Sequence, residues 1–175
     1  MRPRQPLPRH WLMTDPRMGD GLWRALERLP RGAGVVFRHY QLQAPERAEL
    51  YARLRRVARR RHLVLLVAGP RLPGADGQHG ARNRGPNRGL VTWPVHHSRD
   101  LIAARRAGAD AVLVSPVFPT RSHPGAAALG RVRFGLLIRD SAIPVIALGG
   151  MDERRARSLR LLGVHGWAGI DAWAR

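Results

Sequence analysis

The residues best suited to chemistry lie in the run 115–125, which directly follows the apolar stretch Ala111–Val114. Among its hydroxyl and imidazole side chains, three suit the handling of an anion: Thr120, Ser122 and His123. Hydroxyls donate to phosphate, and histidine serves as a cation or as a general acid/base near neutral pH. The plainer interpretation of His123 is an exposed loop histidine before Pro124. A polar loop after a buried strand is nevertheless where a barrel enzyme keeps its chemistry.

Other chemistry-bearing residues follow other apolar runs, and parallel strands of a barrel bring such positions to one face. They are Thr14, Asp15, Arg38, Tyr40, Gly69, His79, His96, Gly149, Gly150 and Asp171. Arg38 is the strongest single candidate for binding, because a buried guanidinium requires a partner. His79 and His96 either face the pocket or are hydrogen-bonded core histidines.

Gly149 and Gly150 follow the apolar run Val145–Leu148 and precede a helix-like segment. Bare backbone amides at such a turn approach an anion closely. Together with the backbone after Ile170, they predict a phosphate site at the seventh and eighth strands, where barrels commonly hold one. The alternative is a tight turn without a ligand.

The elements that must position these residues alternate between short apolar runs and helix-like runs, which favours a parallel sheet. Strands are expected at 10–14, 34–38, 63–68, 76–79, 90–95, 110–114, 145–148 and 167–170, and helices at 22–29, 45–61, 98–107, 131–139 and 152–162. Residues 70–88 contain no convincing helix and are rich in Gly, Pro, Asn and Arg. Eight strands predict a (β/α)8 TIM barrel with an irregular segment around strands three and four, shortened relative to the roughly 250 residues typical of that fold.

The chain of 175 residues is expected to form a single domain, with residues 1–9 as a flexible N-terminus that lacks the apolar core of a secretory signal. Ser98 is expected to cap one helix, and Asp152 with Glu153 to begin another. No apolar run approaches 18 residues, so no membrane span is expected. A cytoplasmic location follows by default.

Composition excludes several mechanisms. All 31 cationic residues are arginine, and the chain contains no cysteine. Schiff-base chemistry, P-loops, disulfides and thiolate chemistry are therefore excluded. The net charge of +19 either attracts phosphorylated ligands or nucleic acid, or reflects a coding bias. The densest basic patch, 53–61, carries no interleaved aromatics, so we interpret it as a solvated helix face rather than a nucleic-acid site.

Several motifs, in this order and spacing, resemble those of the thiamine phosphate synthase family over nearly the whole chain. They are Trp-Leu-Met-Thr-Asp (11–15), Arg38, Ala-Asp-Gly-Gln-His (75–79), His96, Gly-Ala-Asp (108–110), Pro-Val-Phe-Pro-Thr (116–120) and Pro-Val-Ile-Ala-Leu-Gly-Gly-Met (144–151). The resemblance implies a cytoplasmic (β/α)8 enzyme that joins hydroxymethylpyrimidine pyrophosphate to thiazole phosphate. It also implies Mg²⁺ as a cofactor and a dissociative reaction, in which pyrophosphate leaves and the thiazole nitrogen captures a pyrimidine carbocation.

The chain departs from the family pattern at several positions that the resemblance assigns to the site. The Asn-Asp pair after strand three falls on Ala68 and Gly69, and a second metal aspartate falls near Asn83 or Arg84. The remaining departures place Val36, Tyr40, Pro94, His123 and Asp171 where the family carries Gln, Lys, Ser, Lys and Ser. Mg²⁺ prefers carboxylate oxygens, so a metal site is not expected here. Our hypothesis is that arginines such as Arg82, Arg84 and Arg121 supply the missing positive charge.

The resulting expectation is a thiamine phosphate synthase-like transferase with Arg38 and His123 as catalytic residues. Substrate phosphates and the pyrimidine are expected at Thr120, Ser122, His96, His79, Gly149, Gly150, Ile170 and Asp171. One alternative is a thiazole tautomerase-like isomerase, a related enzyme of the same fold, in which His96 or His123 transfers a proton. The other is a non-catalytic, arginine-rich binder of phosphorylated ligands or nucleic acid.

Overall fold

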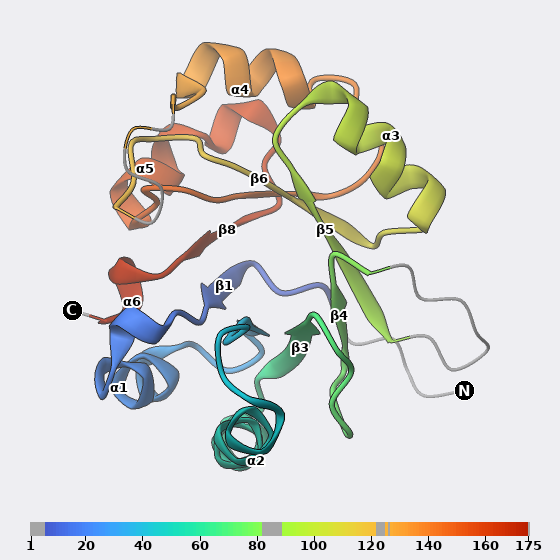
Figure 1. Ribbon diagram of the computed structural model, residues 1–175. Helices are drawn as coiled ribbons and strands as arrows, with labels where there is room; N and C mark the ends of the chain where they lie inside the picture. The colour runs from blue at the N-terminus through green and yellow to red at the C-terminus, as the bar shows by residue number, and fades with distance from the viewer. Residues whose placement is uncertain (1–5, 82–88, 122–124, 126, 175) are drawn as a thin grey trace.

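Eight parallel strands close into a barrel in the computed structural model, which describes residues 6–81, 89–121, 125 and 127–174. Each strand pairs with the next along the chain, and β8 returns to pair with β1. Figure 1 shows this ring of strands with the helices outside it. The strands are β1 (His10–Met13), β2 (Gly34–Phe37), β3 (Val64–Ala68), β4 (Gly77–His79), β5 (Leu90–Val95), β6 (Ala111–Val114), β7 (Val145–Ala147) and β8 (Gly166–Gly169). The predicted TIM-barrel fold is confirmed.

The helices that connect the strands are close to their predicted positions. They are α1 (Gly21–Arg28), α2 (Ala44–Arg60), α3 (Ser98–Ala107), α4 (Gly130–Ile138) and α5 (Glu153–Ser158). The 3-10 turns η1 (Pro16–Met18) and η2 (Arg160–Leu162) also lie between strands, and α6 (Asp171–Ala174) follows β8. The single helix expected over 152–162 was wrong. The chain leaves the α-helix at Leu159 and tightens into η2, and the C-cap is Gly163 in the left-handed region. Neither η1 nor α6 was predicted.

The connections around β4 are irregular, as the sequence predicts. Residues 69–76 join β3 to β4 without a helix, and no helix occurs in the described parts of the β4–β5 connection, which are residues 80, 81 and 89. Among the described residues, no helix lies in the connections on either side of β4, whereas α2 contacts β3 and α3 contacts β5. The strand order of the barrel is intact there.

The core is built from the apolar strand runs. Every residue of β2, β3 and β6 is buried, which explains why these strands read as continuous apolar runs rather than as alternating patterns. At Gly34, a Cβ atom would lie 2.2 Å from the Trp11 ring, so glycine is required for β1 and β2 to pack together. The Trp11 indole N–H donates to Pro8 O at 2.8 Å, which ties residue 8 to the barrel. The expected flexible segment 1–9 includes residues 1–5, which lie outside the described part of the chain.

Of the two helix starts predicted from the sequence, one is confirmed and the other is wrong. Asp152 caps α5, because its side chain accepts from the Arg155 amide at 2.8 Å. The predicted Ser98 cap was wrong: Ser98 is the first helical residue, and His97 is the N-cap in a capping box with Asp100. The Asp100 carboxylate accepts from the His96 and His97 amides, which favours its charged form at the positive end of the helix.

Part of the basic surface of α2 contacts α1. Arg53 lies over the Trp23 ring at 4.9 Å, Arg60 pairs with Glu27, and Arg61 donates to Leu29 O at 2.9 Å. These contacts hold two neighbouring helices together, so only part of the patch is a solvated helix face.

Within the described residues, no helix has the length and apolar character that crossing a membrane demands.

Candidate active site at the carboxyl end of the barrel

A cavity of about 180 Å³ opens at the carboxyl ends of the strands. Seven of the predicted site residues contribute to its wall: Arg38, His96, Thr120, Gly149, Gly150, Ile170 and Asp171. Ser115, Pro116, Leu148, Met151 and Gly169 complete the lining. Positions separated by more than 130 residues therefore meet around one small, half-enclosed space, as parallel strands require.

Arg38 follows β2 directly and crosses the cavity mouth toward β1. Its Nε donates to Thr14 O at 2.9 Å, and its Nη2 donates to Asp15 Oδ2 at 3.2 Å. The backbone amide of Arg38 donates to the Thr14 hydroxyl at 3.0 Å. Burial lowers the pKa of Arg38, while the nearby Asp15 carboxylate opposes that shift. The partner that a buried guanidinium requires is therefore Asp15.

Asp15 is held in its charged form by two arginines. Burial would raise the pKa of Asp15, but hydrogen bonds from the Arg17 side chain and amide outweigh it and lower the pKa overall. Arg17 Nε lies 2.9 Å from Asp15 Oδ1, and the Arg38 bond uses the other oxygen. Because both oxygens are occupied by guanidinium groups, Asp15 serves to orient Arg38.

Gly149 and Gly150 pack against the segment that follows β6. A Cβ at Gly149 would lie 2.7 Å from Pro116 Cα, and one at Gly150 would lie 2.4 Å from Pro119 O. Both residues have positive φ angles, 92° and 59°, which side chains rarely adopt. The Val117 and Phe118 amides donate to Leu148 O and Gly149 O. The glycine pair therefore brings its backbone to the cavity wall and docks the loop after β6 against it.

His96 presents one ring nitrogen to the protein. Its Nδ1 lies 2.8 Å from Ser115 O, a carbonyl that can only accept, so the hydrogen must be on Nδ1. In the neutral imidazole this leaves the lone pair on Nε2. His96 is thereby a candidate proton acceptor on the cavity wall.

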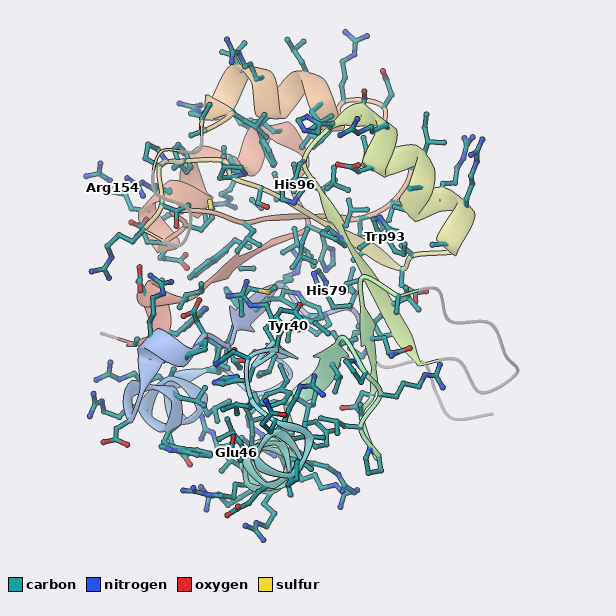
Figure 2. All side chains as sticks on the ribbon, in the orientation of Figure 1. Tyr40, Glu46, His79, Trp93, His96 and Arg154 are labelled. Carbon is teal, nitrogen blue, oxygen red and sulfur yellow. The ribbon has the colours of Figure 1, made fainter. Side chains whose placement is uncertain are left out.

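His79 lies deeper in the barrel and is absent from the cavity lining. Its Nδ1 is 2.9 Å from the Thr92 hydroxyl. Burial, with a further contribution from Arg38, lowers the pKa of His79 to about 4, so the ring is neutral at physiological pH. Figure 2 shows His79 and Tyr40 toward the centre of the barrel, while Glu46 and Arg154 lie at its periphery. This position suits support of Arg38 better than direct contact with a ligand in the cavity.

Two predicted residues, Ser122 and His123, lie outside the described part of the chain, as do Arg82, Asn83 and Arg84. The neighbouring Arg121 is described, and its Nη2 lies 3.1 Å from Asp171 Oδ2. This ion pair joins the loop after β6 to the end of β8, beside Thr120. Thr120 lines the cavity as a possible hydroxyl donor to a ligand.

Some site residues were not singled out from the sequence. Ser115 follows β6 and holds His96 through its carbonyl, and its place directly after a buried strand was the available signal. Arg17 sits in the unpredicted turn η1, so nothing in the sequence connected it to Asp15 as a partner. Met151 and Gly169 have no polar or titratable side chain, so no sequence pattern identifies them as site residues.

The residues that are described do not fit a magnesium site. Among residues 6–81, 89–121, 125 and 127–174, no group of three His, Asp or Glu side chains is placed to hold a metal ion. Ala68 O accepts from the Arg47 guanidinium at 2.8 Å, so a cation already occupies this end of β3. A Cβ at Gly69 would lie 3.4 Å from the Tyr40 ring. A buried guanidinium and an aromatic ring replace the oxygen ligands that Mg²⁺ requires.

The fold and this site define a (β/α)8 barrel with a cavity at the carboxyl ends of its strands, and comparison with known proteins identifies its family. The thiamine monophosphate synthase model, TMP-TENI, matches residues 12–173. The chain therefore belongs to this family of thiamine biosynthesis enzymes, which confirms the family and the transferase class predicted from the sequence. The family match also makes small phosphorylated compounds of thiamine synthesis the expected class of substrate.

Individual relatives have low sequence identity to this chain, but the matches cover most of its length. An Aquifex aeolicus protein, provisionally named thiamine-phosphate synthase 2, is 27% identical over 94% of this chain and 97% of its own length. The bifunctional protein ThiM/ThiE of Symbiobacterium thermophilum is 32% identical over 79% of this chain, a match that spans 32% of that longer protein. Thiamine phosphate pyrophosphorylase from Pyrococcus furiosus superimposes with a TM-score of 0.76 at 24% identity, covering 95% of this chain and 88% of that one. This structural likeness shows the fold.

Proposed function

We propose that residues 1–175 form one thiamine phosphate synthase-like domain that joins hydroxymethylpyrimidine pyrophosphate to thiazole phosphate in the cytoplasm. The observation that carries the proposal is the meeting of Arg38, Thr120, Gly149 and Gly150 on one cavity in a chain of this family. In the reaction, the C–O bond to pyrophosphate breaks and its electron pair leaves with pyrophosphate. The thiazole nitrogen then supplies the pair for the new C–N bond, so no proton transfer is required.

The phosphate of the thiazole substrate is assigned to the β7 and β8 ends. Gly149 and Gly150 supply backbone without side chains there, and Ile170 and Asp171 begin the short turn of α6 on the same wall. Backbone amides of this kind bind phosphate oxygens. A cavity of about 180 Å³ is smaller than the roughly 300–1,000 Å³ of typical drug-sized ligand sites. The described walls therefore account for part of the two-substrate site that the proposed reaction requires.

Arg38 is assigned to the leaving pyrophosphate. Its guanidinium is held in place by Thr14 O and Asp15, so its charge needs little reorganisation when negative charge develops on the leaving group. The dissociative reaction depends on stabilising that charge more than on a base. His123 and Ser122 remain assigned to the same anion from the sequence alone. No step of this assignment uses a metal ion.

An isomerase of the tautomerase type is the second candidate, and His96 is the observation that favours it. The imidazole lines the cavity with Nε2 unprotonated in its neutral form, as a proton-transfer step requires. The coupling reaction has no comparable need for a base at this position.

A pair of assays separates the two candidates. The protein is incubated with both substrates and Mg²⁺, and thiamine phosphate is followed by chromatography; thiazole phosphate alone in D₂O is followed by NMR for isomerisation and exchange. Coupling that persists in His96→Asn establishes the synthase. Exchange that is abolished in His96→Asn, without any thiamine phosphate from the wild type, would overturn the synthase assignment in favour of the isomerase.

A further inference from the structure

An ion pair between Arg121 and Asp171 crosses the rim of the cavity. Arg121 Nη2 and Nε lie 3.1 Å and 3.2 Å from the same oxygen, Asp171 Oδ2. The two residues are 50 positions apart and come from the loop after β6 and the start of α6. Thr120, adjacent to Arg121, and Asp171 itself both line the cavity. The pair therefore bridges the two walls that enclose the predicted phosphate site.

A carboxylate at this position opposes the binding of an anion. Asp171 lines the same cavity as Gly149, Gly150 and Ile170, where a phosphate would approach. Like charges at close range repel, and the effect is strongest where solvent is partly excluded. Arg121 neutralises the carboxylate directly, and the charge of Arg17 also acts on it. The site is thus near neutral at this wall as long as the pair is intact.

The pair is well suited to exchange partners. Arg121 is 74% exposed, whereas Asp171 is 35% exposed, so the arginine can leave without uncovering a buried group. Exposed pairs of this kind contribute little to stability, so breaking one is easy. The two Arg121 nitrogens share a single Asp171 oxygen. This contact is weaker than the parallel two-oxygen arrangement that a phosphate offers to a guanidinium.

We propose that Asp171 and Arg121 form an exchangeable clasp that tunes phosphate affinity: a ligand phosphate competes with the Asp171 carboxylate for the Arg121 guanidinium. The exchange assigns Arg121 a direct contact with the bound phosphate, and it assigns Asp171 the role of weakening that contact. Product that carries the same phosphate then leaves more readily, because the carboxylate recaptures the arginine. The inference rests on the proposed phosphate site, although it does not require the coupling reaction.

The clasp predicts substitutions with effects of opposite sign. Asp171→Asn removes the competing charge, so inorganic phosphate and thiazole phosphate should bind about three- to tenfold more tightly, measured by isothermal titration calorimetry at low ionic strength. Arg121→Gln should weaken binding by a similar factor. In the double variant, Asp171→Asn can no longer release an arginine, so any gain that remains should come only from removing the repulsion of the unpaired carboxylate and should vanish at high salt. High salt should reduce all of these differences.

Matched controls come from an exposed pair on the same molecule. Arg139 and Asp140 lie 3.6 Å apart and are 73% and 86% exposed, and neither lines the cavity. Asp140→Asn and Arg139→Gln change the net charge identically and should leave phosphate affinity within about twofold. Weaker phosphate binding by Asp171→Asn would overturn the clasp, as would equal gains in Asp171→Asn and Asp140→Asn. If coupling fails but Asp171→Asn still tightens phosphate binding, only the proposed reaction is wrong.

Discussion

Arg38 and Asp15 form an ion pair across the mouth of the barrel, with Arg38 Nη2 3.2 Å from Asp15 Oδ2. The two residues follow β2 and β1, and a second bond from Arg38 Nε to Thr14 O fixes the plane of the guanidinium. Only 21% of the Arg38 side chain is exposed, and it faces the cavity. The pair thus positions a permanent charge where an anion would bind.

Replacing Arg38 should affect catalysis more than folding. Arg38→Met is expected to lower kcat/KM for the pyrimidine pyrophosphate by about 10²–10³-fold, the usual effect of losing one charge-stabilising donor. Arg38→Lys should recover little, because an ammonium cannot reproduce both bonds in one plane. Steady-state kinetics check this, with exposed Arg139→Gln as the control. Full activity in Arg38→Met would remove this residue from the mechanism.

The loop after β6 depends on the missing side chain at Gly149. Gly149→Ala places a methyl group 2.7 Å from Pro116 Cα at a φ of 92°, so backbone must shift. We expect a loss of about 2–4 kcal/mol in the free energy of unfolding, measured by urea denaturation. Gly163→Ala is the matched control: its φ is 73° and nothing lies within 4 Å of the added atom. It should cost only about 1 kcal/mol, from backbone strain alone. Equal costs at the two positions would contradict the packing role.

Buried, neutral His79 predicts acid-sensitive stability. Its folded pKa is about 4 against 6.5 for an unperturbed histidine, so between these values the unfolded chain binds more protons and stability falls as pH decreases. The loss is on the order of 2–3 kcal/mol across that window. His79→Asn, which can keep a bond to Thr92, should flatten the curve of unfolding free energy between pH 4 and 6.5. His39, whose pKa burial also lowers, contributes in the same direction and leaves a residual slope.

Asp15 acts in a lower pH window than His79. Its folded pKa lies below 3.8, so its stabilising contribution is present above that value and is lost as pH falls further. If the unfolding free energy of His79→Asn depends on pH above pH 4 as steeply as that of the wild type, His79 is not the group that titrates in that window.

Magnesium alone should not bind measurably to the protein. The described residues place Ala68, Gly69 and the Arg47 guanidinium at the end of β3 where the family carries oxygen ligands. We therefore expect 5 mM Mg²⁺, roughly the concentration that a weak site requires, to shift Tm by less than about 1 °C in the absence of pyrophosphate. A shift of several degrees that EDTA reverses would show that carboxylates elsewhere complete a metal site.

The fold was predictable because each strand signal is local. Continuous apolar runs such as Val64–Ala68 mark buried parallel strands, and their alternation with amphipathic runs predicts closure of the sheet. The errors fell where tertiary contacts decide the local structure. At Leu159 the helix tightens to a 3-10 turn. At His97, a residue outside the usual capping set, the backbone amide donates to the Asp100 carboxylate.

The sequence predicts where the site lies, but it does not predict which residues form ion pairs and hydrogen bonds there. The rule that strand ends converge identified most of the cavity wall, including Arg38, Thr120 and Gly149. The partners of these residues could not be read in the same way, since the Arg121–Asp171 pair joins residues 50 positions apart. His79 shows the opposite limit, because its place at the end of β4 did not reveal that it is absent from the cavity lining.

The measurement that tests the account most directly is formation of thiamine phosphate from hydroxymethylpyrimidine pyrophosphate and thiazole phosphate, compared between the wild-type protein and Arg38→Met. The account predicts product from the wild type and a loss of about 10²-fold or more in the variant, with binding of thiazole phosphate retained in both. Absence of product from a folded wild-type protein that binds both substrates would contradict it.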